Sequence, residues 1–108
     1  MVESAYRRIV LRADAARDAI EAYDWYERQR EGLGGEFMLA LEQTFASMSR
    51  GPQRFPFVRG KYRRAMLRRF PCGVYFAERD GVEGVASLVV VAIMHARQNP
   101  RRWRKRTG

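Results

Sequence analysis

The feature that most constrains this chain is an apolar run late in the sequence, Ser87-Leu88-Val89-Val90-Val91-Ala92-Ile93-Met94. Residues 88–94 are all apolar, with no alternation of polar and apolar positions. A strand without alternation is buried on both faces, so we expect residues 87–94 to be a central strand. The run is far shorter than the roughly 20 apolar residues that a membrane-spanning helix needs.

Two helices are predicted before that strand. In the first, which ends near Gln29, small and aromatic residues recur at helical spacing: Ala16, Ala19 or Ile20, Tyr23 and Tyr26. In the second, apolar residues form one face: Leu33, Phe37, Leu41, Phe45 and Met48. Gly32 closes the first helix, and the link through Gly35 is too short to carry the chain away. The two helices are therefore predicted to form an αα-hairpin.

Three further strands complete the predicted fold. They lie at residues 5–12, 62–70 and 74–77, the first as an edge strand. Residues 53–60 are predicted to be a loop because prolines and a glycine punctuate them. The order β-α-α-β-β-β favours an α+β fold, in which the αα-hairpin packs on a twisted, mainly antiparallel sheet. We expect residues 1–108 to be a single domain, with a tail at residues 101–108 that can be flexible.

The charge of the chain is unevenly distributed. The formal net charge is +9, but residues 1–53 contain seven Lys or Arg against nine Asp or Glu. Residues 54–108 contain fourteen Lys or Arg and only three acidic residues. This asymmetry favours an acidic partner, either a nucleic acid or an acidic protein segment.

The single cysteine, Cys72, excludes an internal disulfide and a cysteine-based metal site. We interpret Cys72 as a small buried hydrophobic residue and predict no metal and no cofactor. The first residues, Met1-Val2-Glu3-Ser4, lack an export pattern. We therefore expect a cytoplasmic protein that does not act at a membrane.

Several pieces of the chain, in this order and spacing, resemble a known family. They are Trp25-Tyr26-Glu27-Arg28-Gln29 with Gly32-Leu33-Gly34, Phe37 and Leu41-Glu42; Arg64-Ala65-Met66-Leu67-Arg68-Arg69-Phe70-Pro71 with Val74-Tyr75-Phe76; and Ala92-Ile93-Met94-His95-Ala96-Arg97, Pro100 and Trp103. On these residues the chain resembles the toxins of the RelE/ParE superfamily, closest to the ParE-like branch of bacterial type II toxin-antitoxin systems. The resemblance implies a small toxin held inactive in a heteromeric complex by a cognate antitoxin.

Two activities compete within this superfamily. RelE-like members are mRNA endonucleases that work on the ribosome, and ParE-like members act on DNA gyrase. RNA cleavage without a metal needs a proton acceptor and a proton donor, and arginine is a poor proton carrier because its pKa is too high. His95 is the candidate general base, beside Arg97 and Arg101; alternatively it fixes the end of the strand by a hydrogen bond. RelE-like nucleases tend to end in a basic-aromatic tail that carries a tyrosine. Here no tyrosine follows Tyr75, which favours the ParE-like branch.

A binding surface is predicted where the apolar strand ends. Its candidate residues are His95, Arg97, Arg101, Arg102, Trp103 and Arg104, within a basic run that continues to Arg106. We expect Trp103 to anchor this tail on the sheet rather than to stack on a base. A basic sheet face could extend the surface through Arg63, Arg64, Arg68 and Arg69.

Three hypotheses of function follow. The first is a ParE-like toxin that inhibits DNA gyrase and is neutralised by an antitoxin, with no catalytic residue assigned. The second is a RelE-like mRNA endonuclease with His95 at its site. The third is a basic nucleic-acid-binding module without toxicity, whose affinity would fall steeply with salt.

Overall fold

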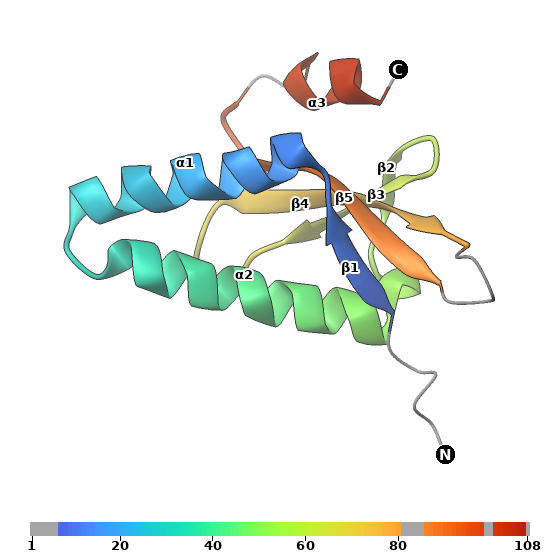
Figure 1. The fold of residues 1–108 in the computed structure, drawn as a ribbon, viewed down its shortest axis with the longest axis horizontal. Coiled ribbons are helices and arrows are strands. Elements are labelled where there is room, and N and C mark those ends of the chain that lie inside the picture. The colour runs from blue at the N-terminus through green and yellow to red at the C-terminus, as the bar shows by residue number, and fades with distance from the viewer. Residues whose placement is uncertain (1–6, 81–85, 99–100, 108) are drawn as a thin grey trace.

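The apolar run forms the strand β5, Ser87–His95, and all of its residues before His95 are buried. The computed structural model describes residues 7–80, 86–98 and 101–107 (Figure 1). β5 lies inside a five-stranded sheet of order β1-β5-β4-β3-β2. The other strands are β1, Arg8–Leu11; β2, Phe57–Arg59; β3, Tyr62–Met66; and β4, Cys72–Arg79. The prediction of a strand buried on both faces is confirmed, and β1 is an edge strand as expected.

Strand directions confirm the mainly antiparallel sheet. β1 runs parallel to β5, while the pairs β5–β4, β4–β3 and β3–β2 are antiparallel. The β4–β5 register shifts at one point, because Tyr75 pairs with Ala92 whereas Phe76 pairs with Val90. This bulge adds one residue, Val91, to β5. Consequently Val91 and its neighbour Ala92 both contribute to the same face of the sheet.

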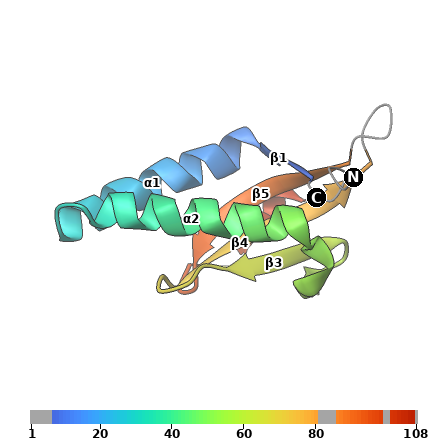
Figure 2. The same ribbon diagram turned by 90° about the horizontal axis from the view of Figure 1, so that it is seen from below.

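The predicted αα-hairpin is confirmed and covers one face of the sheet (Figures 1 and 2). It consists of α1, Ala13–Gln29, and α2, Leu33–Arg50. Gly32, between them, has a φ of 91°, a left-handed conformation that favours glycine. The predicted apolar face of α2 packs into the main core with residues of β4 and β5, among them Phe76 and Val90.

A third helix, α3, Arg101–Arg106, packs on the opposite face of the sheet. Its Trp103 is 3% exposed and stacks on Tyr75 at 4.6 Å between ring centroids, with Tyr62 edge-on at 5.9 Å. Trp103 thus anchors the C-terminal segment on the sheet, as expected. The segment for which the sequence allowed a flexible tail is helical over these six residues.

The prediction of a loop over residues 53–60 is wrong in part. Pro52–Arg54 form a 3-10 helix, and Phe57–Arg59 form β2, which pairs with β3. Gly60, with a φ of 54°, permits the tight turn between the two strands. Arg63 stabilises this hairpin, because its guanidinium lies 3.8 Å from the Phe57 ring centroid and donates to the Phe55 carbonyl oxygen.

The strand predicted over 62–70 is shorter than expected. It ends at Met66, and a turn follows in which the Leu67 N–H donates to the Cys72 carbonyl oxygen. Arg69 in this turn has a φ of 70°. Of the strand predicted over 5–12, residues 5 and 6 lie outside the described residues. Among the helices described, none is long and apolar enough to cross a membrane.

Candidate functional site

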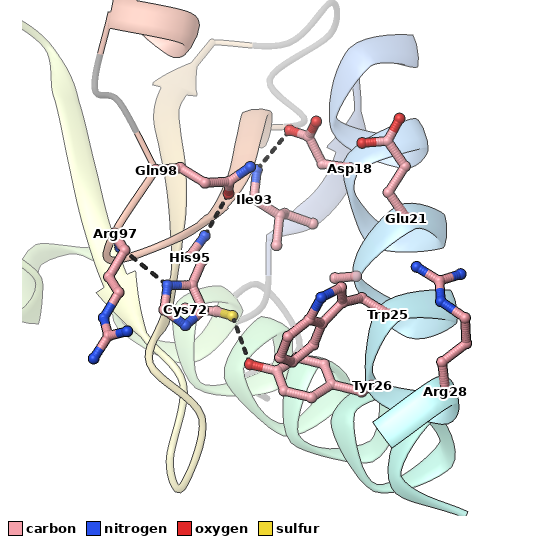
Figure 3. Close-up of a pocket in the computed structure, with 11 residues that line it drawn as sticks. Asp18, Glu21, Trp25, Tyr26, Arg28, Cys72, Ile93, His95, Arg97 and Gln98 are labelled. Carbon is pink, nitrogen blue, oxygen red and sulfur yellow. Dashed lines mark hydrogen bonds between the residues drawn. The ribbon is translucent and has the colours of Figure 1, made fainter. Parts of the chain in front are cut away.

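The predicted site begins at the end of β5, where His95 lies in a tight hydrogen-bonded turn (Figure 3). The His95 N–H donates to the Gln98 side-chain oxygen at 2.7 Å, and the Arg97 N–H donates to His95 Nδ1 at 3.0 Å. The Gln98 N–H donates back to the His95 carbonyl oxygen. His95 is thus held in place by the backbone that follows it.

The hydrogen bond at Nδ1 limits what His95 can do. An acceptor nitrogen carries no proton, so the neutral ring bears its proton on Nε2. In this arrangement Nε2 can donate a hydrogen bond, while Nδ1 is occupied by the Arg97 N–H. The geometry therefore suits a binding or positioning role for His95 better than the role of a general base.

Beside His95 lies a pocket of about 530 Å³ between α1 and the end of β5. Figure 3 shows its two walls, one from α1 and one from the end of β5 with the turn after it. The residues that line it are Asp18, Glu21, Ala22, Trp25, Tyr26, Arg28, Cys72, Ile93, His95, Arg97 and Gln98. The pocket joins two stretches of chain that lie about 70 residues apart in sequence.

The buried part of the pocket is apolar and chemically inert. The Tyr26 hydroxyl and the Cys72 Sγ are 3.5 Å apart, and both residues are buried. Burial is the largest cause that raises the pKa of the Tyr26 hydroxyl, and the contact with Cys72 raises it further. Burial likewise raises the pKa of the Cys72 thiol. Both groups therefore stay protonated. The prediction that Cys72 is a small buried residue is confirmed.

The α1 wall is more exposed and carries charge. Glu21, Trp25 and Arg28 follow one another at helical spacing, and Trp25 is 49% exposed. Its ring lies edge-on against Tyr26 at 5.1 Å. Trp25 is thus a large apolar surface at the rim of the pocket, with a guanidinium from Arg28 on the same helix.

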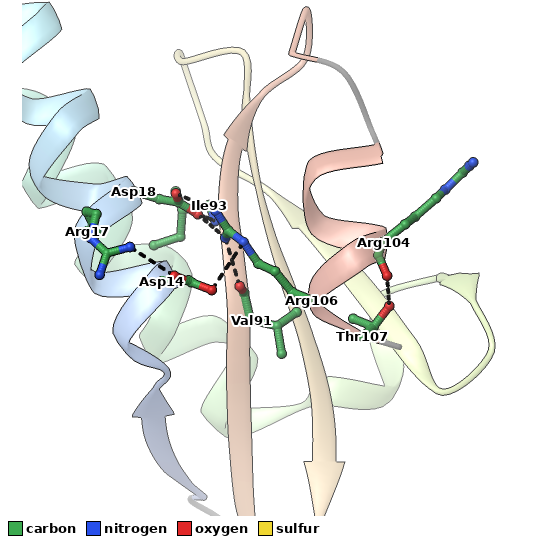
Figure 4. A network of polar contacts seen from close by, with 8 residues as sticks. All are labelled: Asp14, Arg17, Asp18, Val91, Ile93, Arg104, Arg106 and Thr107. Atoms are coloured by element: carbon green, nitrogen blue, oxygen red, sulfur yellow. Dashed lines mark hydrogen bonds and ion pairs between the residues drawn. The ribbon is translucent and has the colours of Figure 1, made fainter.

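Asp18, one of the residues that line the pocket, is held in an ion pair with Arg106 (Figure 4). Arg106 of α3 donates to both carboxylate oxygens of Asp18, at 2.7 and 3.1 Å, and also to the Val91 carbonyl oxygen at 3.0 Å. The Ile93 N–H donates to Asp18 as well, at 3.0 Å. The hydrogen bond with Asp18 is the largest cause that raises the pKa of Arg106.

This ion pair supplies hydrogen-bond partners to the backbone of β5 where β1 no longer pairs with it. β1 pairs with β5 only as far as Leu11, and the Arg12 N–H makes the next bond, to the Val90 carbonyl oxygen. Beyond that point, side chains of α1 and α3 satisfy the backbone groups of Val91 and Ile93. Arg106 therefore faces inward, although the sequence grouped it with a basic run on the surface.

The remaining residues of the predicted binding surface are divided. Arg97 lines the pocket with His95, while Arg101 and Arg104 are exposed on α3, on the far face of the sheet. Trp103 is buried between α3 and the sheet. Arg102 belongs to α3, and its side chain lies outside the described residues.

The arginines of the predicted basic sheet face do not lie on one face. Arg63 is largely buried on the α2 side of the sheet, with its Nε 3.4 Å from a carboxylate oxygen of Glu78. Arg64 is exposed on the other face, where it covers Gly73. Arg68 and Arg69 lie in the turn before β4 and line a smaller groove of about 300 Å³ against α2.

The pocket's lining has the composition of a binding surface. It combines an apolar base, an exposed tryptophan and guanidinium groups, a composition typical of binding hot spots. Among the residues that the structure describes, no three His, Cys, Asp or Glu side chains gather to hold a metal ion. Sequence reasoning found His95 and Arg97 but missed Asp18, Glu21, Trp25 and Arg28. These four residues recur at helical spacing on one face of α1, and this spacing was the feature of the sequence that could have indicated them.

The class of fold follows from these elements. An αα-hairpin on a mixed five-stranded sheet, with β1 parallel to β5, is the RelE/ParE-like fold. A chain of a solved structure, the chromosomal ParDE TA system from P. aeruginosa, matches with a TM-score of 0.67 and 16% identity. The match covers 84% of this chain and 97% of that chain. No protein-family model and no curated protein matches the sequence.

Proposed function

We propose that this chain is the toxin of a type II toxin-antitoxin system, acting in the cytoplasm and neutralised by a cognate antitoxin. The observation that carries the proposal is the fold, which this chain shares over most of its length with a chain of a ParDE TA system. The basic second half of the sequence supports it, because a chain of this charge suits an acidic neutralising partner.

The proposed target is DNA gyrase. A nuclease would need a proton acceptor beside its cationic residues, and the one histidine has its Nδ1 engaged by the Arg97 N–H. The tyrosine and the cysteine of the pocket are buried and keep their protons. These features favour inhibition by binding, as in ParE-like toxins, over RNA cleavage.

The test combines a growth assay with two biochemical measurements. Inducible expression of the chain alone is expected to arrest growth, and co-expression of the protein encoded by the adjacent reading frame is expected to restore it. The purified chain is expected to inhibit supercoiling by gyrase and to leave mRNA intact. His95→Ala is expected to retain toxicity.

Each other result points to a different function. Rapid mRNA cleavage that is abolished in His95→Ala would identify an endonuclease. Growth arrest with unaffected supercoiling would reject gyrase as the target. Full expression without any effect on growth would reject a toxin and favour a nucleic-acid-binding module.

A further inference from the structure

The β2–β3 hairpin and the residues just before it combine aromatic and basic side chains. Residues 54–64 contain five Lys or Arg, three Phe or Tyr and no Asp or Glu. The hairpin forms the edge of the sheet opposite β1 (Figure 1). Cys72, at the start of β4, lines the pocket described above, whereas the hairpin turn lies toward the other end of β4, because Arg63 pairs with Phe76. This surface is therefore separate from the pocket.

Phe57 of β2 is a large aromatic side chain that is 59% exposed. The Arg63 guanidinium covers one face of its ring, 3.8 Å from the centroid. Arg63 is held in this position because it donates to the Phe55 carbonyl oxygen at 2.7 Å and lies 3.4 Å from a carboxylate oxygen of Glu78. The ring is thus supported on one face, and its exposure leaves the other face available for stacking.

Two cations lie at the turn that follows Phe57. Arg59 and Lys61 are both exposed, and neither makes an ion pair within the described part of the chain. Arg59 follows Phe57 by two residues, a separation of about 6–7 Å along a strand. The Glu78 carboxylate also contacts this hairpin, but it is paired with Arg63. The charges of Arg59 and Lys61 therefore remain available to phosphate groups.

The chain that leads into the hairpin is ordered by contacts with the rest of the fold. Arg54 donates to the Ser47 carbonyl oxygen at 2.8 Å and to the Ser47 hydroxyl at 2.9 Å, which ties the segment to α2. Phe55 packs edge-on against Phe76, with 6.1 Å between the ring centroids. A surface that is ordered before its ligand arrives loses little conformational freedom on binding.

We propose that the β2–β3 hairpin binds single-stranded nucleic acid, with one base stacked on the free face of Phe57 and neighbouring phosphates at Arg59 and Lys61. An aromatic platform together with cations that follow the backbone is the usual composition of single-strand binding sites. A duplex fits less well, because its bases stack on one another and cannot cover the ring. An acidic protein segment would use the cations but leave the planar ring uncovered. DNA and RNA strands share the required chemistry, so both are tested. The inference goes beyond the proposed function and does not depend on it.

The first experiment measures the stacking contact. Fluorescence anisotropy follows binding of short labelled oligonucleotides, one of deoxythymidine and one of uridine, to the purified chain at low salt. Phe57→Leu is expected to weaken binding at least fivefold, because it removes the stacking platform. Phe57→Tyr keeps the ring and is expected to bind within about twofold of wild type. Ile20→Ala is the matched control, since Ile20 on α1 is 62% exposed, and it is expected to bind like wild type.

The second experiment measures the phosphate contacts through their dependence on salt. For single strands, the slope of log K against log salt concentration is about −0.7 for each phosphate neutralised. Arg59→Gln/Lys61→Gln is therefore expected to weaken binding and to make the slope shallower by about 1.4. Arg8→Gln/Arg12→Gln makes the same change in net charge at exposed positions in and beside the opposite edge strand. It is expected to leave the slope unchanged, and circular dichroism verifies that all variants fold.

The outcomes separate this inference from the alternatives. If a duplex binds as tightly as the single strands and Phe57→Leu has no effect, binding rests on charge alone and the inference is wrong. If an acidic peptide binds through the hairpin and the oligonucleotides do not, the surface is a protein site and the inference is wrong. If none of these probes binds, the inference is wrong and the proposed function is unaffected. If the single strands bind as expected but expression does not arrest growth, the inference stands and the proposed function fails.

Discussion

Glu27 fastens the turn between the two long helices with both of its carboxylate oxygens. Its two carboxylate oxygens accept the Gly32 and Gly34 N–H groups, each at 2.9 Å. These are backbone donors at the start of α2 that have no partner within the helix. A side chain near the end of α1 thus caps the beginning of α2.

Stability should depend on pH through this carboxylate. The hydrogen bonds from Gly32 and then Gly34 lower the pKa of Glu27 below its ordinary value. Because the pKa of Glu27 is lower in the folded state, its carboxylate contributes fully to the free energy of unfolding above the unfolded-state pKa. That contribution is lost as pH falls through the folded-state pKa. Glu27→Gln is therefore expected to be less stable than wild type in urea at pH 7, with the difference shrinking in acid. A difference independent of pH would contradict this assignment.

Gly34 is required by the close approach of the helices. A Cβ at this position would lie 2.9 Å from the Tyr23 carbonyl oxygen and 2.9 Å from Glu27 Oε1. Gly34→Ala is expected to lower the free energy of unfolding by about 1–3 kcal/mol. Gly35→Ala is the matched control, since nothing lies within 4 Å of its Cβ. It is expected to raise stability by about 0.4–1 kcal/mol, and urea unfolding of both variants measures the contrast.

At the scale of elements, α3 depends on two attachments: Trp103 on the sheet and Arg106 on Asp18. Arg106→Ala would leave the Asp18 carboxylate buried with only the Ile93 N–H as a partner. Removing one member of a buried ion pair costs about 3–5 kcal/mol, and we expect about 2–4 kcal/mol because 16% of the Arg106 side chain is exposed. Arg104→Ala on the same helix is the control, expected within about 0.5 kcal/mol. Equal unfolding curves for both variants would show that the ion pair is not stabilising.

The elements that the sequence predicted are those with a repeating apolar pattern. β5 has an unbroken apolar run, and α2 has an apolar residue every three to four positions. The elements that it missed, β2 and α3, are short and hold their positions through distant partners. α3 has one apolar residue among six, and nothing near it in the sequence indicates Tyr75 or Asp18.

The sequence likewise predicted only one wall of the candidate site. His95 and Arg97 were identified because they directly follow the apolar run. The α1 wall was missed, because the helical pattern of the sequence does not separate Trp25 from its neighbour Tyr26. Tyr26 is 8% exposed, whereas Trp25 is 49% exposed. The tertiary fold decides which residues of α1 face the end of β5. The pattern of residues along the sequence does not show this.

For the whole molecule, the sheet separates two surfaces of different character. The αα-hairpin side carries the acidic residues of α1 and α2 together with the pocket, whereas α3 presents exposed arginine and lysine side chains on the other side. A partner held in the pocket would therefore leave the exposed residues of α3 uncovered unless it also crossed the sheet edge. If the proposed function holds, neutralisation and target binding would then involve different faces of the same small protein.

The Asp18–Arg106 pair also bears on how the chain reaches its final form. It joins residues 88 positions apart, so the chain must close a very long loop before the pair can form. We expect the pair to form after the folding transition state, once the hairpin and the central strands have docked. Breaking it should then speed unfolding much more than it slows folding. The lifetime of the folded protein, more than its rate of formation, would depend on this one contact.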